Sequence, residues 1–274
     1  MLEMFQYAFM QRALITGVVI AIACALLGVF LVLKKYALLG DGIAHISFGG
    51  VATGLLFNIT PFLSALFFSI IGALGILNIK ERAKLHGDSA IGIVSHASLG
   101  IGIFILSIAR GFNVDILSFL FGSILAIKVS EMYLSIGLAI AVIVLIFAFY
   151  HELFASTFDE DAAKTLGINA HRLDTLLIVL TAITIVSAMR VVGLMLASAL
   201  LILPAATALQ CNVSFKKTLF VAVLISIFSV FFGLVLAFIF DFAVSGTIVL
   251  LNAGFFIGVL LIKRIYNYIL QKPF

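Results

Sequence analysis

The 274-residue sequence contains few charged residues, three prolines, two cysteines and no tryptophan. Charged residues make up only 10% of the chain, whereas they form about a quarter of an ordinary globular domain, so a soluble globular protein is excluded. Cys24 and Cys211 lie in separate apolar stretches, which excludes both a disulfide framework and a thiolate metal site. No G-x-x-x-x-G-K-[ST] phosphate loop occurs, so we expect ATP hydrolysis only on another chain.

Apolar residues dominate the sequence. They make up 64% of the sequence, and the mean hydropathy is +1.34. This composition predicts an all-α, polytopic transmembrane bundle of about eight or nine spans with broken helices, forming a single domain over 1–274. The candidate spans are about 13–33, 37–57, 61–79, 89–109, 130–150, 173–190, 192–210, 218–240 and 247–262. The apolar segment 115–127 is too short to span, which favours a re-entrant or interfacial position.

Basic residues gather in five clusters between these spans. The clusters are Lys34 with Lys35, Lys80 with Arg82 and Lys84, Lys164 with Arg172, Lys216 with Lys217, and Lys263 with Arg264. All five fall on one face, which the positive-inside rule assigns to the cytoplasm, so the N-terminus is predicted outside and the C-terminus inside. Arg12, Arg110 and Arg190 are single exceptions at outer ends. Although the net charge is +4, no basic face is available for nucleic acid, and membrane lipid is the expected surrounding.

The segment "LLGDGIAHISFGG" places two ionisable residues inside the second span. Asp41 and His45 are four residues apart and therefore share one helix face, with His45 predicted near the middle of the bilayer. Ionisable groups at that depth face a polar cavity, pair with one another or bind an ion. Glycines 40, 42, 49, 50 and 54 leave room for another backbone to approach or for the helix to break.

A carboxylate and an imidazole are also ligands for Zn²⁺, Mn²⁺ or Fe²⁺. One Asp41–His45 pair offers only half of a four-coordinate shell, and a second copy of the chain across a two-fold axis would complete it. The alternative is a structural ion pair or a hydrogen-bonded bridge between helices. The ligand types do not decide among the three metals.

His96 lies in the fourth span, between Gly92 and Gly100 on one helix face. It is a weaker candidate ligand, because a membrane histidine without an adjacent carboxylate can simply bond to a neighbouring helix.

The longest cytoplasmic loop is predicted over about 151–173, and it contains "FDEDAAKTLGI". A short helix from about Phe158 to Leu166 is expected, with Thr157 and Glu160 at capping-box spacing and Gly167 as its stop. The acids Asp159, Glu160 and Asp161 suit the positive end of the helix dipole. Such a helix against the membrane could bind a cytosolic partner or have none. His151 and Glu152 resemble the start of a zinc-protease motif, but the second histidine is absent, so no catalytic residue is assigned.

Five segments in order resemble the zinc, manganese and iron branch of the ABC-importer membrane permeases. They are "LLGVFLVLKKYALLGDGIAHISFGGVATG", "SAIGIV", "FDEDAAKTLGI", "VVGLMLASALLILPAATA" and "SGTIVLLNAGFF".

The resemblance implies a permease in a prokaryotic plasma (inner) membrane, homodimeric or occasionally heterodimeric. It also implies two cytosolic ATPase subunits that bind ATP, an extracytoplasmic metal-binding protein, and no permanently bound cofactor beside the transported metal. Asp41 and His45 match the family's residues on the metal path, whereas His96 matches no known family ligand. The proposed ATPase-coupling residues are Phe158, Asp159, Glu160, Asp161, Lys164, Leu166 and Gly167.

Two other functions remain open from the sequence. A permease for cobalamin, haem or iron-siderophore would need a wide cavity, whereas a ligand pair among glycines suits a bare ion better. A gradient-driven secondary metal transporter would more often carry several membrane acids, and this chain offers chiefly Asp41.

Overall fold

The computed structural model describes residues 6–83, 87–108, 114–123 and 128–270. Over these residues the chain is helical and contains no strand. The helices are α1 (Ala8–Leu33), α2 (Leu39–Leu56), α3 (Pro61–Arg82), α4 (Gly87–Ile108), α5 (Val114–Phe121), α6 (Val129–Ala148), α7 (Tyr150–Phe158), α8 (Glu160–Thr165), α9 (Ala170–Ala188), α10 (Leu194–Gln210), α11 (Phe215–Phe240) and α12 (Val244–Leu270).

Each predicted span falls on one of these helices, with most ends within three residues; α1 begins five residues earlier and α12 ends eight residues later than predicted. Seven helices in the described part of the chain are long and apolar enough to cross a membrane: α1, α3, α4, α6, α9, α11 and α12. The chain is therefore a multi-pass membrane protein. The other two predicted spans correspond to α2 and α10. The mean hydropathy of α2 is lowered by Asp41, His45 and its glycines, and α10 has only 17 residues. That these two helices also cross the membrane stays a prediction.

Helix α1 forms the centre of the bundle and packs against α6, α9, α10 and α11. Small residues allow the close approach: a Cβ atom on Gly28 would lie 1.9 Å from the carbonyl oxygen of Leu201 on α10. Only glycine fits such a helix crossing, so α1 and α10 approach closely at this point.

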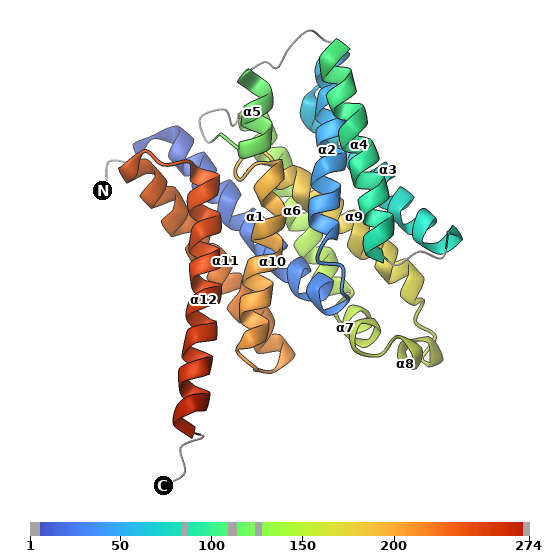
Figure 1. The fold of residues 1–274 in the computed structure, drawn as a ribbon, viewed down its shortest axis with the longest axis vertical. Coiled ribbons are helices and arrows are strands. Elements are labelled where there is room, and N and C mark those ends of the chain that lie inside the picture. Colours follow the sequence, from blue (N-terminus) through green and yellow to red (C-terminus); the bar gives the residue numbers. More distant parts are fainter. Residues whose placement is uncertain (1–5, 84–86, 109–113, 124–127, 271–274) are drawn as a thin grey trace.

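Helix α2 packs against both α3 and α4 on one side of the molecule, and α11 and α12 lie on the opposite side (Figure 1). The glycines of α2 make this packing possible. A Cβ atom at Gly42 would lie 2.5 Å from the side chain of Ile91 on α4, and one at Gly50 would lie 2.7 Å from the backbone of Ala65 on α3. The buried Ser47 and Ser69 hydroxyls share a hydrogen bond of 2.7 Å between α2 and α3. The predicted close approach of backbones is confirmed.

The segment 115–127 contributes the eight-residue helix α5, which packs against α10 and α2. Its re-entrant or interfacial position stays a prediction, and its last four residues lie outside the described part, as do Lys84 and Arg110. Helix α6 ends at Ala148, and α7 starts after the single residue Phe149. The predicted loop over 151–173 is therefore mostly helical, with α7, α8 and the start of α9 at one end of the molecule (Figure 1).

Candidate metal site and coupling surface

Asp41 and His45 lie in the first two turns of α2. Asp41 is in the first turn, where unpaired backbone N–H groups favour a carboxylate. The two side chains face one another, with His45 Nε2 3.5 Å from Asp41 Oδ2. The Asp41 side chain is 53% exposed in the single chain, and that of His45 is 17% exposed. The pair is thus open on the carboxylate side rather than sealed within its own subunit.

The second ring nitrogen of His45 has no partner. His45 Nδ1 is buried and makes no hydrogen bond with any residue that the structure describes. A buried polar atom without a partner costs free energy, so such atoms in native proteins usually mark a ligand, a water molecule or a functional strain. The Asp41–His45 contact therefore leaves one ring nitrogen of His45 available to a further partner.

Helix α4 brings His96 next to the pair. The ring centroids of His45 and His96 are 6.2 Å apart. His96 Nδ1 lies 2.7 Å from the carbonyl oxygen of Gly92, one turn earlier on the same helix. A histidine that donates from Nδ1 carries its lone pair on Nε2, which is the arrangement of many metal-ligating histidines. His96 is the tenth of 22 residues in α4, about 14 Å along the helix, so it lies near the middle of that helix.

The cluster is incomplete as a metal site within one chain. Among the described residues, no group of three His, Cys, Asp or Glu side chains is close enough to hold a metal ion. Asp41, His45 and His96 are neighbours, but they do not converge on one point in this conformation. Their ligand types suit a borderline divalent cation, and the shell needs additional donors or a change of conformation.

The predicted cytoplasmic helix is shorter than expected. Helix α8 covers Glu160–Thr165, whereas Phe158 is the last residue of α7. The predicted capping box is wrong: the Thr157 hydroxyl donates to the carbonyl of Leu153 inside α7. Asp159 is the N-cap instead, and its carboxylate accepts a hydrogen bond of 2.9 Å from the backbone N–H of Ala162. Thr157 cannot cap α8 because it still lies within α7, which continues to Phe158.

The surface of α8 is charged in the middle and apolar at both ends. Lys164 forms an ion pair of 2.9 Å with Glu160, which holds the pKa of that carboxyl below its usual range. The Asp161 side chain is 96% exposed. Phe158 and Leu166 expose 59% and 75% of their surface on either side. Exposed large apolar residues that flank a charged helix are typical of a protein contact surface.

Gly167 ends α8 with a φ of +79°, as predicted for a helix stop. Nothing lies within 4 Å of the position that a Cβ atom would occupy. The backbone conformation alone therefore favours glycine here.

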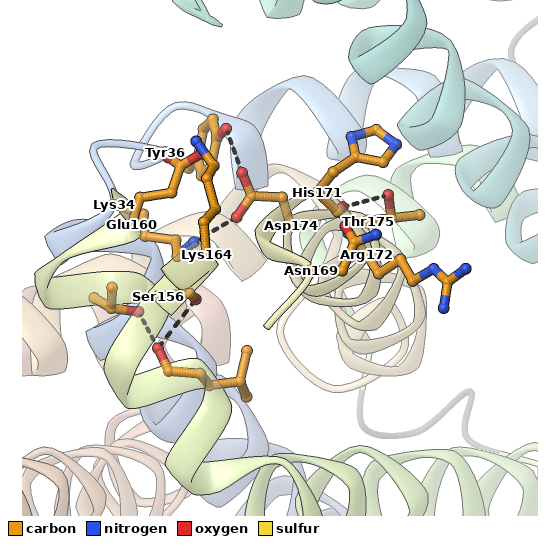
Figure 2. Close-up of polar contacts among 12 residues, drawn as sticks. Lys34, Tyr36, Ser156, Glu160, Lys164, Asn169, His171, Arg172, Asp174 and Thr175 are labelled. Atoms are coloured by element: carbon orange, nitrogen blue, oxygen red, sulfur yellow. Dashed lines mark hydrogen bonds and ion pairs between the residues drawn. The ribbon is translucent and has the colours of Figure 1, made fainter. Parts of the chain in front are cut away.

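A polar network lies behind α8 and was not predicted from the sequence (Figure 2). Asp174 on α9 forms an ion pair with Lys34 and accepts a hydrogen bond from the Tyr36 hydroxyl at 3.3 Å. The Lys80 ammonium on α3 donates to the same hydroxyl. Burial raises the pKa of Tyr36, so the phenol stays protonated and can donate to Asp174. The network joins the ends of α1 and α3 to the start of α9, and a polar hollow of about 590 Å³ separates it from α8.

A second buried ion pair also has no clear signal in the sequence. Arg190 follows α9 and lies with its Nε 2.8 Å from Oε2 of Glu131 on α6, and the side chains are only 10% and 8% exposed. The Arg190 guanidinium also stacks over the ring of Phe119 on α5, 4.0 Å from its centroid. Arg190, expected as a single basic exception at an outer end, thus connects α5 to α6 through its side chain.

Comparisons with known proteins agree with this architecture. A model of the ABC 3 transport family matches residues 6–263. The chain is 36% identical over 247 residues to the manganese transport system membrane protein MntC of Listeria innocua, covering 90% of this chain and 88% of the relative. It is 32% identical over 255 residues to the high-affinity zinc uptake system membrane protein ZnuB of Haemophilus influenzae, covering 93% and 97%.

A solved structure is similar over nearly the whole chain. It is PsaBC from Streptococcus pneumoniae in complex with Fab, with a TM-score of 0.84 and 34% identity, covering 94% of this chain and 93% of that chain. Both the sequence and the helix arrangement thus agree with one family over almost their full length. The chain belongs to the ABC 3 transport family.

Proposed function

We propose that the chain is the permease subunit of an ATP-driven importer of a divalent transition metal, with Mn²⁺, Zn²⁺ or Fe²⁺ as cargo. The observation that carries the proposal is the Asp41–His45 pair: an open carboxylate beside an imidazole whose Nδ1 is buried without a partner, on a membrane helix. The names of the relatives, which include manganese and zinc systems, support the same cargo class.

A second permease copy, most simply an identical one, completes the metal site. One chain supplies Asp41 and His45 with His96 nearby, and a two-fold axis beside α2 would supply two carboxylates and at least two imidazoles. The exposure of Asp41 supports this arrangement, because a charged side chain facing lipid is costly.

Energy comes from cytosolic ATPase subunits that bind at Phe158, Asp159, Glu160, Asp161, Lys164, Leu166 and Gly167. The absence of a phosphate loop in the sequence and the exposed apolar ends of α8 support this assignment. An extracytoplasmic metal-binding protein delivers the ion, and the chain itself performs no catalysis.

In the proposed orientation, the N-terminus lies outside a prokaryotic cell and the C-terminus lies in its cytoplasm. ATP binding draws the ATPase subunits together, α8 moves with them, and the helices that bear Asp41 and His45 change access from outside to inside. Ligation must be weaker in the inward state, because equal affinity for both states would shift no equilibrium.

The test is ATP-dependent uptake of competing Mn²⁺, Zn²⁺ and Fe²⁺ into vesicles that hold the complete complex. We expect Asp41→Asn and His45→Ala to reduce uptake to background while membrane insertion is unchanged. Asp241→Asn is the matched control: it removes one carboxylate at the end of α11, where the left-handed backbone also suits asparagine. Near-normal uptake by both site variants would refute the metal path.

A further inference from the structure

An apolar hollow of about 540 Å³ opens between α1, α6, α7 and α11. Its walls include Leu26, Phe147, Leu219 and Val223, and its polar residues include His151 and Lys216. A smaller hollow of about 300 Å³ continues from it and shares His151 and Lys216. None of these lining residues belongs to the Asp41 cluster or to α8.

The hollow extends from the membrane boundary into the apolar layer. Lys216 is the second residue of α11, and Val223 lies seven residues further, about 10 Å along the helix. Lys216 and Lys217 form one of the five basic clusters, so this boundary is the cytoplasmic one. A lipid of the inner leaflet that sits here would place its headgroup at Lys216 and an acyl chain beside Val223.

The charge at this end of α11 is unbalanced. Lys216 and Lys217 lie in the first turn, where the helix dipole is already positive, and the turn contains no acidic residue. Ser214, the N-cap, makes no side-chain hydrogen bond to the turn, so the backbone N–H groups are uncapped. No Asp or Glu lines either hollow, and no ion pair of Lys216 occurs within the described part of the chain.

An anion would offset this charge. The positive-inside rule accounts for two lysines at the boundary, but it does not account for one of them closing an apolar hollow beside a histidine. Basic pockets between membrane helices on the cytoplasmic side are suited to acidic lipid headgroups.

We propose that this hollow is a binding site for one anionic phospholipid of the inner leaflet. The phosphate lies against Lys216, His151 and the first-turn N–H groups of α11, and an acyl chain lies along Leu26, Phe147 and Val223. The site does not depend on the transported ion, and its place in the inner leaflet rests on the proposed orientation.

The experiment measures lipid retained on the full-length protein by native mass spectrometry, after incubation with equal amounts of phosphatidylglycerol and phosphatidylcholine. We expect the wild type to retain phosphatidylglycerol preferentially. Lys216→Gln should lower the ratio of the two retained lipids about fivefold. Lys217→Gln is the matched control, because it removes the same charge from the same turn but does not line the hollow, and it should change the ratio less than twofold.

A third variant tests the apolar wall. Val223→Phe fills the hollow without altering charge, and we expect it to reduce retention of both lipids. If Val223→Phe fails to fold, the comparison of Lys216→Gln with Lys217→Gln still tests the lipid site. Equal effects of the two lysine variants on the lipid ratio would mean that general surface charge attracts the lipid, and would contradict the proposed site. So would an unchanged lipid ratio in Lys216→Gln, including the case in which that variant instead loses a protein partner.

Discussion

A hydrogen bond to its own helix fixes the ring of His96. Because Nδ1 is engaged by the Gly92 carbonyl, the free Nε2 is the nitrogen that can bind an incoming ion. His45 has the opposite arrangement, with Nε2 toward Asp41 and Nδ1 unpartnered. The two imidazoles thus differ in role, with His45 coupled to the carboxylate and His96 positioned alone on the neighbouring helix.

His96→Leu is expected to weaken metal binding without abolishing transport. Loss of one neighbouring imidazole should raise the metal concentration for half-maximal uptake by about tenfold, because Asp41 and His45 remain. The measurement is a metal titration of ATP-dependent uptake in vesicles. His171→Leu, the same replacement at an exposed histidine paired with Glu81, should leave that concentration unchanged. Complete loss of uptake in His96→Leu, or no effect at all, would contradict this intermediate role.

The Asp41–His45 pair could be predicted from sequence because both residues lie on one helix, where spacing fixes their neighbourhood. The proximity of His96 could not be predicted, since it depends on how α2 and α4 cross. That crossing is set by contacts such as Gly42 against Ile91, which no local pattern reveals.

The end of α8 depends on the conformation of one residue. Gly167 adopts a φ of +79° with open space around it, so a replacement is penalised by its backbone and not by a clash. A residue with a Cβ pays about 1–2 kcal/mol in this region, a β-branched one more, and asparagine least.

Gly167→Val should therefore distort the link between α8 and α9, whereas Gly167→Asn should preserve it. We expect the number of metal ions imported per ATP hydrolysed to fall several-fold in the valine variant and to stay near normal in the asparagine variant. Reconstituted vesicles with both activities measured together provide the test. A normal ratio in Gly167→Val would remove the helix end from the coupling path.

Element positions were predictable where one strong pattern acts and less so where two compete. Long apolar runs indicated the predicted spans. Such runs are helical because backbone polar groups in lipid must form hydrogen bonds within the helix. The start of α8 was misplaced because Thr157 and Asp159 are both suitable caps, and the continuation of α7 through Phe158 decides between them. Helix α7 itself had no separate signal, since it follows α6 after one residue.

At the scale of the whole molecule, the network around Asp174 connects α9, which follows α8 in the chain, to the segment before α2. Asp174 connects the first turns of α9 to Lys34 and Tyr36, which precede α2. The Lys34 side chain is only 7% exposed, and this carboxylate is its ion-pair partner. We therefore expect a displacement of α8 and α9 to reach the segment that leads into the Asp41 helix.

Asp174→Asn should break this transmission. The substitution leaves the buried Lys34 ammonium without a counter-charge, and unpaired buried charges are strongly unfavourable, so the segment before α2 should rearrange. We expect the ATPase subunits to remain bound while metal import per ATP falls several-fold. Glu81→Gln is the matched control, because Glu81 lies on the same face but pairs with His171 at an exposed position, where an ion pair contributes little. If both variants lowered the ratio equally, general surface charge and not the Asp174 network would connect the coupling surface to the metal site.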